Sequence, residues 1–254
     1  MTLLEMTAVL LAGVAAGTIN TVVGSGTLIT FPTLLAFGVP PVTANVSNTI
    51  GLVPGSVSGA IGYRRELVGQ RARLIRLASA SLLGGIVGAV LLLALPEEAF
   101  SAIVPVLIGL GCLLVVLQPT ISRRVALRRE GRGTVHEHGP LWVWVLVFAT
   151  GVYGGYFGAA QGVLLMAVMG IGIQETLQRL NAVKNVLAGL VNGVAAVIFM
   201  AVAEVDWVVA ALIAVGSVVG GQVGATVGRR LPPLALRIVI VLVGVAALTA
   251  FLVG

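Results

Sequence analysis

Eight apolar segments, each about 20 residues long, constrain the fold of this chain more than any other feature. They span residues 3–23, 44–63, 74–95, 99–118, 141–160, 181–203, 207–228 and 233–253. A helix of about 20 apolar residues rises 1.5 Å per residue and crosses a bilayer core about 30 Å thick. Only 9% of the 254 residues are charged, whereas soluble domains carry about 25%. The sequence therefore predicts an all-α, multi-pass integral protein of the cell membrane and excludes a water-soluble enzyme.

Two further apolar stretches, Thr27–Phe37 and Val163–Ile171, are too short to cross a membrane. The first follows the glycine turn Gly24-Ser25-Gly26, and the second follows the glycine-flanked run Gly158–Gly162. A half-length helix after such a break is typical of the discontinuous helices of transporters. Irregular backbone at membrane depth is tolerated only inside protein or beside water. We therefore expect a broken or re-entrant helical hairpin at the start of each half.

The two halves of the chain resemble each other. The run Gly84–Ala89 (GGIVGA) returns as Gly220–Ala225 (GGQVGA), 136 residues further along. The same offset relates Leu95-Pro96 to Leu231-Pro232. The order and spacing of these matches favour an internal duplication over chance recurrence of small residues.

Charges at equivalent loops of the two halves have opposite signs. The loop after the second segment holds five arginines, Arg64, Arg65, Arg71, Arg73 and Arg76. Its counterpart in the second half holds only Glu204 and Asp206. Because arginine-rich loops stay in the cytoplasm, the halves should have inverted topology, each with a broken hairpin and three transmembrane helices. We predict repeats at 1–118 and 141–254, a cytoplasmic basic linker at 119–140, and both termini outside.

The chain lacks the residue patterns of an enzyme. Its acidic residues and both histidines lie at segment ends or in loops, and no His, Cys, Asp and Glu cluster has metal-ligand spacing. We therefore predict no catalytic residue, no metal site and no cofactor. The net charge of +6 sits mostly in short loops, so it sets membrane orientation and does not indicate nucleic-acid binding. The expected partners are the lipid bilayer and a small anionic substrate, and a homo-oligomer is left open.

Polar side chains inside the apolar segments group at equivalent places in the two halves. They are Asn45, Ser47 and Asn48 in the first half, and Asn181, Lys184 and Asn185 in the second. Unpaired amides are costly in hydrocarbon, so these groups should face the protein interior. They bond neighbouring helices or bind a ligand, and the clustering favours a ligand site. Lys184, the single lysine, has two interpretations: an interfacial lysine at the cytoplasmic side, or a cation at the base of an anion cavity.

The glycine breaks point to the charge of the ligand. A helix N-terminus carries free N–H groups and about half a positive charge, so it can bind an anion. Both short helices begin directly after a break, and their starts should point into one cavity. The binding residues expected there are Gly24, Ser25, Gly26, Thr27, Gln161 and Gly162. The alternative is that the glycines only let helices pack closely.

The first half resembles the TauE/SafE family of membrane permeases. The similarity lies in Val23-Gly24-Ser25-Gly26, Phe31-Pro32-Thr33-Leu34-Leu35, Gly38-Val39-Pro40-Pro41 and Ala44-Asn45-Val46-Ser47-Asn48-Thr49, in that order. A weaker form returns in the second half. The resemblance implies an anion permease that exports sulfite or small organosulfur anions such as sulfoacetate.

Together these features predict a transporter that exports a small sulfur-containing anion by alternating access, with its site at the midplane between the repeats. An anion channel or passive facilitator is the main alternative, because no coupling residue is visible. A membrane-embedded enzyme or assembly factor is disfavoured by the missing acid–base cluster.

Overall fold

The computed structural model describes residues 1–129, 139–227 and 233–253, and these residues form ten helices without a strand. They are α1 (Leu3–Val22), α2 (Thr27–Ala36), α3 (Pro41–Gly62), α4 (Arg71–Ala94), α5 (Glu97–Arg129), α6 (Leu141–Tyr156), α7 (Gln161–Gly172), α8 (Leu177–Val202), α9 (Trp207–Thr226) and α10 (Pro233–Val253). All eight long segments and both short ones of the sequence prediction therefore appear as helices. The predicted all-α class is confirmed.

Five helices of the described part are long and apolar enough to cross a membrane: α1, α4, the Glu97–Ile121 part of α5, α8 and α9. A multi-pass membrane protein follows from their length and composition. Two predicted boundaries were wrong. The segment 141–160 is not one long helix, because α6 ends at Tyr156 after 16 residues, about 24 Å. The segment 99–118 continues as helix to Arg129, because its arginines, alanine and leucine are good helix formers.

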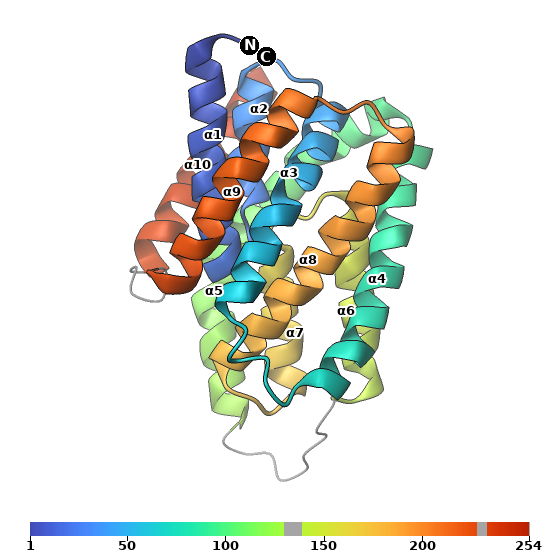
Figure 1. Cartoon of the computed structure of the whole chain (residues 1–254), viewed down its shortest axis with the longest axis vertical. Helices are drawn as coiled ribbons and strands as arrows, with labels where there is room; N and C mark the ends of the chain where they lie inside the picture. The colour runs from blue at the N-terminus through green and yellow to red at the C-terminus, as the bar shows by residue number, and fades with distance from the viewer. Residues whose placement is uncertain (130–138, 228–232, 254) are drawn as a thin grey trace.

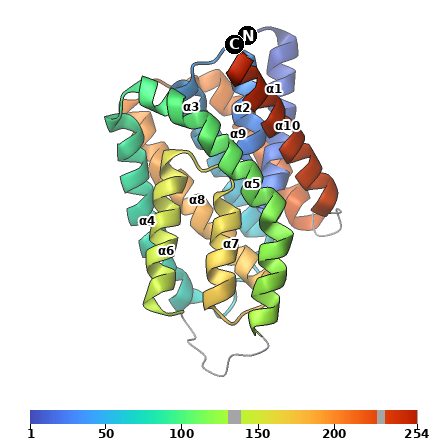
Figure 2. The same cartoon turned by 180° about the vertical axis from the view of Figure 1, so that it is seen from behind.

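The two short hairpins enter the molecule from opposite ends (Figures 1 and 2). Both termini lie at one end, where α1 begins, and α2 returns toward that end. Helix α6 starts at the other end, and α7 returns there. The turns between α1 and α2, and between α6 and α7, therefore lie inside the molecule.

The two halves interleave. Helix α1 packs on α9 and α6 packs on α4, so the opening helix of each half lies against the fourth helix of the other half. Helix α3 likewise contacts α9, α8 contacts α4, and α3 and α8 meet each other. The contact of α1 with α9 thus corresponds to that of α6 with α4, and the contact of α3 with α9 corresponds to that of α8 with α4.

The repeated glycine motif makes these contacts. Gly84 and Gly88 of α4 lie against the backbone of α6, and Gly220 and Gly224 of α9 lie against the backbone of α1. A Cβ on any of the four would overlap the backbone of the opposite helix. Small residues let membrane helices approach closely enough to gain dispersion energy without a hydrophobic driving force. The recurrence of GGxxG at the 136-residue offset therefore has a packing cause in both halves.

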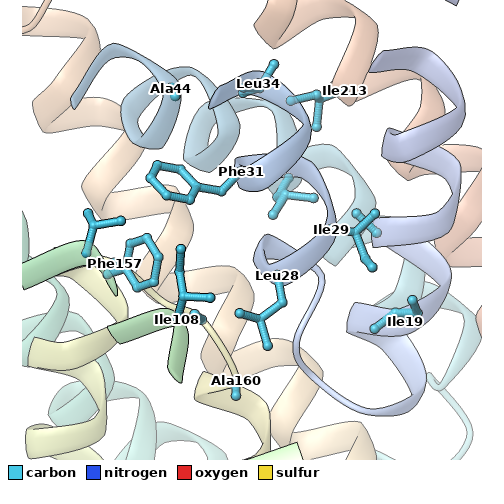
Figure 3. Packing of buried hydrophobic residues seen from close by; sticks show 14 of the residues in the cluster. Ile19, Leu28, Ile29, Phe31, Leu34, Ala44, Ile108, Phe157, Ala160 and Ile213 are labelled. Carbon is cyan, nitrogen blue, oxygen red and sulfur yellow. The ribbon is translucent and has the colours of Figure 1, made fainter. Parts of the chain in front are cut away.

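Aromatic rings hold the turn between α6 and α7 in place. Phe157, in that turn, packs edge-on against Phe31 of α2 with ring centres 5.0 Å apart, and against Phe100 of α5 at 6.0 Å. Figure 3 shows Phe31 and Phe157 pointing toward each other, with Leu28 and Ile108 below them. All three rings are buried. This cluster joins the short helix of the first half to the break of the second.

Candidate functional site

The two glycine breaks touch each other inside the protein. The Gly162 amide, at the start of α7, donates a hydrogen bond of 2.9 Å to the carbonyl of Gly24. A Cβ on either residue would overlap the backbone of the other. Gly24 and Ala160 have left-handed backbone conformations, with φ of 89° and 59°. The breaks thus bring a segment of each half into direct contact.

Each break also carries a buried polar side chain without a partner. Ser25 and Gln161 are 1% and 3% exposed, and neither the Ser25 hydroxyl nor the Gln161 Nε2 makes a hydrogen bond with the described residues. Gln161 packs against Gly154 of α6, where a Cβ would overlap its amide. A buried unpaired donor costs about 1–3 kcal/mol, so such groups indicate a place for a ligand or an ordered water.

The amides of the two short helices differ in availability. Those of Ser25, Gly26 and Thr27, at the start of α2, donate to no acceptor in the described residues. The amide of Gly162, at the start of α7, is occupied by Gly24. Of the two predicted amide sites, only the start of α2 presents free donors in this conformation.

The second-half polar cluster lies at the C-terminus of α1. The Lys184 ammonium donates to the carbonyls of Asn20 at 2.9 Å and Thr21 at 3.1 Å. The side-chain amides of Asn181 and Asn185 donate to the same Thr21 carbonyl at 3.2 and 3.3 Å. The last carbonyls of a helix lack partners within the helix and carry partial negative charge. These three side chains of α8 therefore cap a helix of the other half.

Lys184 is completely buried, with an exposed fraction of 0%. The interpretation as an interfacial lysine was therefore wrong, because its ammonium reaches α1 and not the membrane surface. No carboxylate of residues 1–129, 139–227 or 233–253 pairs with it. Its side chain runs beside Gly162, where the Cδ would lie 3.0 Å from an added Cβ. The ammonium has three N–H donors, and the two carbonyls occupy two of them.

Part of the first-half cluster repeats this arrangement. The Asn45 amide donates at 2.9 Å to the carbonyl of Tyr156, the last residue of α6. Asn45 caps α6 as Asn181 caps α1, each from the third helix of the opposite half. The Asn45 Oδ1 and the Tyr156 hydroxyl are buried and unpaired within the described residues.

The other two predicted residues of that cluster have different roles. Asn48 accepts a hydrogen bond from Thr30 and donates to the Thr27 hydroxyl at 3.4 Å, which ties α3 to α2. The Ser47 hydroxyl accepts a 2.9 Å hydrogen bond from the Asp206 amide before α9. Ser47 therefore joins α3 to the α8–α9 loop, and the structure does not bring it to the glycine breaks.

Ser56 of α3 is a nearby residue that the sequence prediction missed. It is buried, and its hydroxyl lies 3.5 Å from the amide nitrogen of Asn20, whose carbonyl binds Lys184. The run Gly55-Ser56-Val57-Ser58-Gly59, small and polar inside an apolar helix, was the available signal.

Comparisons with known proteins place the chain in one family. The family model described as sulfite exporter TauE/SafE matches residues 9–251. A probable membrane transporter protein, ORF9, of Sinorhizobium sp is 28% identical over 92% of this chain and 87% of its own length. The probable membrane transporter protein YfcA of Escherichia coli K12 is 26% identical over 83% and 76%. No solved structure matches. A match across nearly the whole chain, on a helical membrane fold with two contacting helix breaks, shows that the chain belongs to the sulfite exporter TauE/SafE family of membrane transporters.

Proposed function

We propose that this transporter moves small sulfur-containing anions, such as sulfite or sulfoacetate, and binds them where the two glycine breaks meet. One observation carries the proposal: the buried Lys184 ammonium lacks a carboxylate among the described residues, and its side chain runs beside Gly162, where the two breaks meet. The same breaks hold the buried unpaired donors of Ser25 and Gln161. A buried charge is costly unless it is paired. A bound anion would pair the buried ammonium of Lys184 and accept hydrogen bonds from the unpaired donors.

The groups around the break match the chemistry of an oxyanion. The Ser25 hydroxyl, the Gln161 amide and the free amides at the start of α2 are donors, and a sulfite or sulfonate group presents three acceptor oxygens. The third N–H of Lys184 supplies a charge-assisted donor, which is stronger than a neutral one. The positive end of α2 adds to the same preference.

We further propose that the halves are inverted-topology repeats that exchange conformations during outward transport. Three features support this: hairpins that enter from opposite ends (Figures 1 and 2), glycine motifs that pack on the opening helix of the other half, and reciprocal caps from Asn45 and Asn181. Two equivalent halves can adopt each other's conformation, which is the basis of alternating access in many transporters.

Transport by purified protein in liposomes tests the substrate, with sulfite, sulfoacetate, taurine and sulfate as competitors. Ser25→Ala removes one hydrogen bond to a charged ligand, which is worth about 1.5–3 kcal/mol, so affinity should fall about 10- to 150-fold. The matched control is Ser81→Ala on α4, because Ser81 is also buried and unpaired among the described residues. Equal affinities of Ser25→Ala and Ser81→Ala for the anion would contradict binding at the break.

An isosteric charge change gives a second, sharper test. Gln161→Glu keeps the shape of the side chain and places a carboxylate where the anion should bind. We expect binding of every anion to be abolished while the protein remains folded by gel filtration. Retained binding would contradict the site, whatever the substrate.

The alternative function is an anion channel or passive facilitator. It is favoured by one observation: the described helices hold no carboxylate in their interior that could couple transport to protons. Saturable flux with counterflow identifies a carrier, and linear voltage-driven current identifies a channel.

A further inference from the structure

A groove of about 370 Å³ runs between α3 and α8. Val57 and Ile61 of α3 and Val186 and Leu190 of α8 form its walls. The volume falls within the range of about 300–1,000 Å³ that is typical of small-ligand sites. Val57 and Ile61 are 53% and 51% exposed, so the groove opens sideways toward the membrane. An occupant of these walls needs a hydrocarbon chain.

One end of the groove is basic. Arg64, just beyond the end of α3 at Gly62, lines the groove and is exposed. Its guanidinium makes no hydrogen bond or ion pair with the described residues. Arg65 and Arg71 are exposed in the same region. Arginines at the membrane surface attract anionic lipid headgroups, at about 1 kcal/mol for each residue.

We propose that this groove binds one anionic phospholipid, with an acyl chain along the apolar walls and the phosphate at Arg64. Arg64 has no side-chain partner among the described residues and lies at one end of a laterally open, mostly apolar groove. This arrangement matches a charged headgroup on a hydrocarbon chain. A fully hydrated inorganic anion would find mostly apolar surface between Arg64 and the two polar residues of the lining, Ser56 and Asn185.

The inner end of the groove reaches the candidate site. Ser56 and Asn185 line it there, and Asn185 caps α1 through the Thr21 carbonyl. The lipid chain therefore lies between α3 and α8, the two helices that supply the capping amides. An occupied groove holds these helices at their present spacing.

Native mass spectrometry of the detergent-purified full chain tests the proposal, with phosphatidylglycerol and phosphatidylcholine titrated separately. We expect one phosphatidylglycerol to bind about fivefold more tightly than phosphatidylcholine, from one arginine contact. Arg64→Gln should abolish this preference. Arg65→Gln is the matched control, because Arg65 is an exposed neighbour that does not line the groove. Ala60→Leu, inside the groove, should weaken both lipids.

Three results would overturn the proposal. Equal affinity of the unaltered protein for phosphatidylglycerol and phosphatidylcholine would contradict recognition of the headgroup by Arg64. An equal effect of Arg64→Gln and Arg65→Gln would show diffuse attraction to the surface. Displacement of phosphatidylglycerol by sulfoacetate would assign the groove to the transported anion.

Discussion

Replacing Gly24 by alanine tests the contact between the two breaks, on which the candidate site depends. Gly24 has a φ of 89°, and an added Cβ would overlap the backbone of Gly162. The left-handed conformation costs a non-glycine residue about 1–2 kcal/mol. Inserting a methyl group against fixed backbone costs about 1–3 kcal/mol more. Gly24→Ala should therefore destabilise the protein by about 2–5 kcal/mol in total.

Gly38→Ala separates these two contributions. Gly38 also has a left-handed φ, 75°, but no atom lies within 4 Å of its added Cβ. Gly38→Ala should lower the free energy of unfolding only by the cost of the left-handed conformation, about 1–2 kcal/mol. The difference between the variants, about 1–3 kcal/mol, measures the contact between the breaks. Gly162→Ala probes the same contact from the other side without a left-handed residue, and it should also be destabilising because its Cβ would overlap Gly24.

Thermal unfolding in detergent, followed by circular dichroism at one fixed scan rate, measures these effects. For a chain of this size each kcal/mol lowers the unfolding midpoint by about 2–4 °C. Gly24→Ala should thus unfold several degrees below Gly38→Ala. Equal midpoints for Gly24→Ala and Gly38→Ala would refute the contact between the breaks, because the overlap with Gly162 is what should lower the Gly24→Ala midpoint further.

Three further predictions address packing, pH and orientation. Gly88→Ala and Gly224→Ala, at equivalent places in the two halves, should each lower the free energy of unfolding by about 1–3 kcal/mol, measured by thermal unfolding. The control Gly109→Ala should be neutral or stabilising, because the nearest atom to its added Cβ is 4.0 Å away. A Gly88→Ala variant of unchanged stability would contradict the close α4–α6 packing. Burial by itself would raise the pKa of Glu175, but hydrogen bonds from Arg73, the Thr176 amide and Arg179 prevail and hold this pKa below its ordinary value of 4.5. The stabilisation from Glu175 is therefore present above pH 4.5 and lost as the pH falls through the lowered pKa. Glu175→Gln should lower the free energy of unfolding by about 1 kcal/mol at pH 7. In a pH series of unfolding midpoints, this variant should also show a smaller decline below pH 4.5 than the unaltered protein. In a Cys112→Ala background, which removes the single cysteine, Glu130→Cys should react with an impermeant maleimide only from the cytoplasmic side, and labelling from outside would reverse the proposed orientation.

Much of the fold could be predicted from the sequence because its signals are local. Apolar length reports a membrane helix wherever it occurs, and a glycine run reports a break without knowledge of its neighbours. The sequence predicted a break at Gly158–Gly162 but continued the preceding segment to residue 160, whereas α6 ends at Tyr156. The residues 157–160 are apolar or small, like the helix before them, so composition could not locate this end. It follows from the left-handed Gly158 and Ala160 and from the packing of Phe157 on Phe31.

Only part of the candidate site could be predicted from the sequence. Sequence spacing correctly placed a short helix after each glycine break, and it singled out Lys184 between two asparagines. It could not choose between a surface lysine and a buried one, because hydropathy does not say which side of a helix faces protein. It also grouped Ser47 with Asn45 and Asn48, although the Ser47 hydroxyl bonds the Asp206 amide at the start of α9.

The sequence by itself determined that this chain lies in a membrane and that a short helix follows each of its two glycine breaks, since composition and glycine breaks are properties of the chain alone. Its internal similarity predicts two repeats. Only the tertiary structure decided what the polar residues do. The partners of Lys184 are carbonyls 163 and 164 residues away, and the Gly162 amide meets a carbonyl of the other half. Such contacts exist because the halves interleave, and no local pattern encodes which helix end a buried donor reaches.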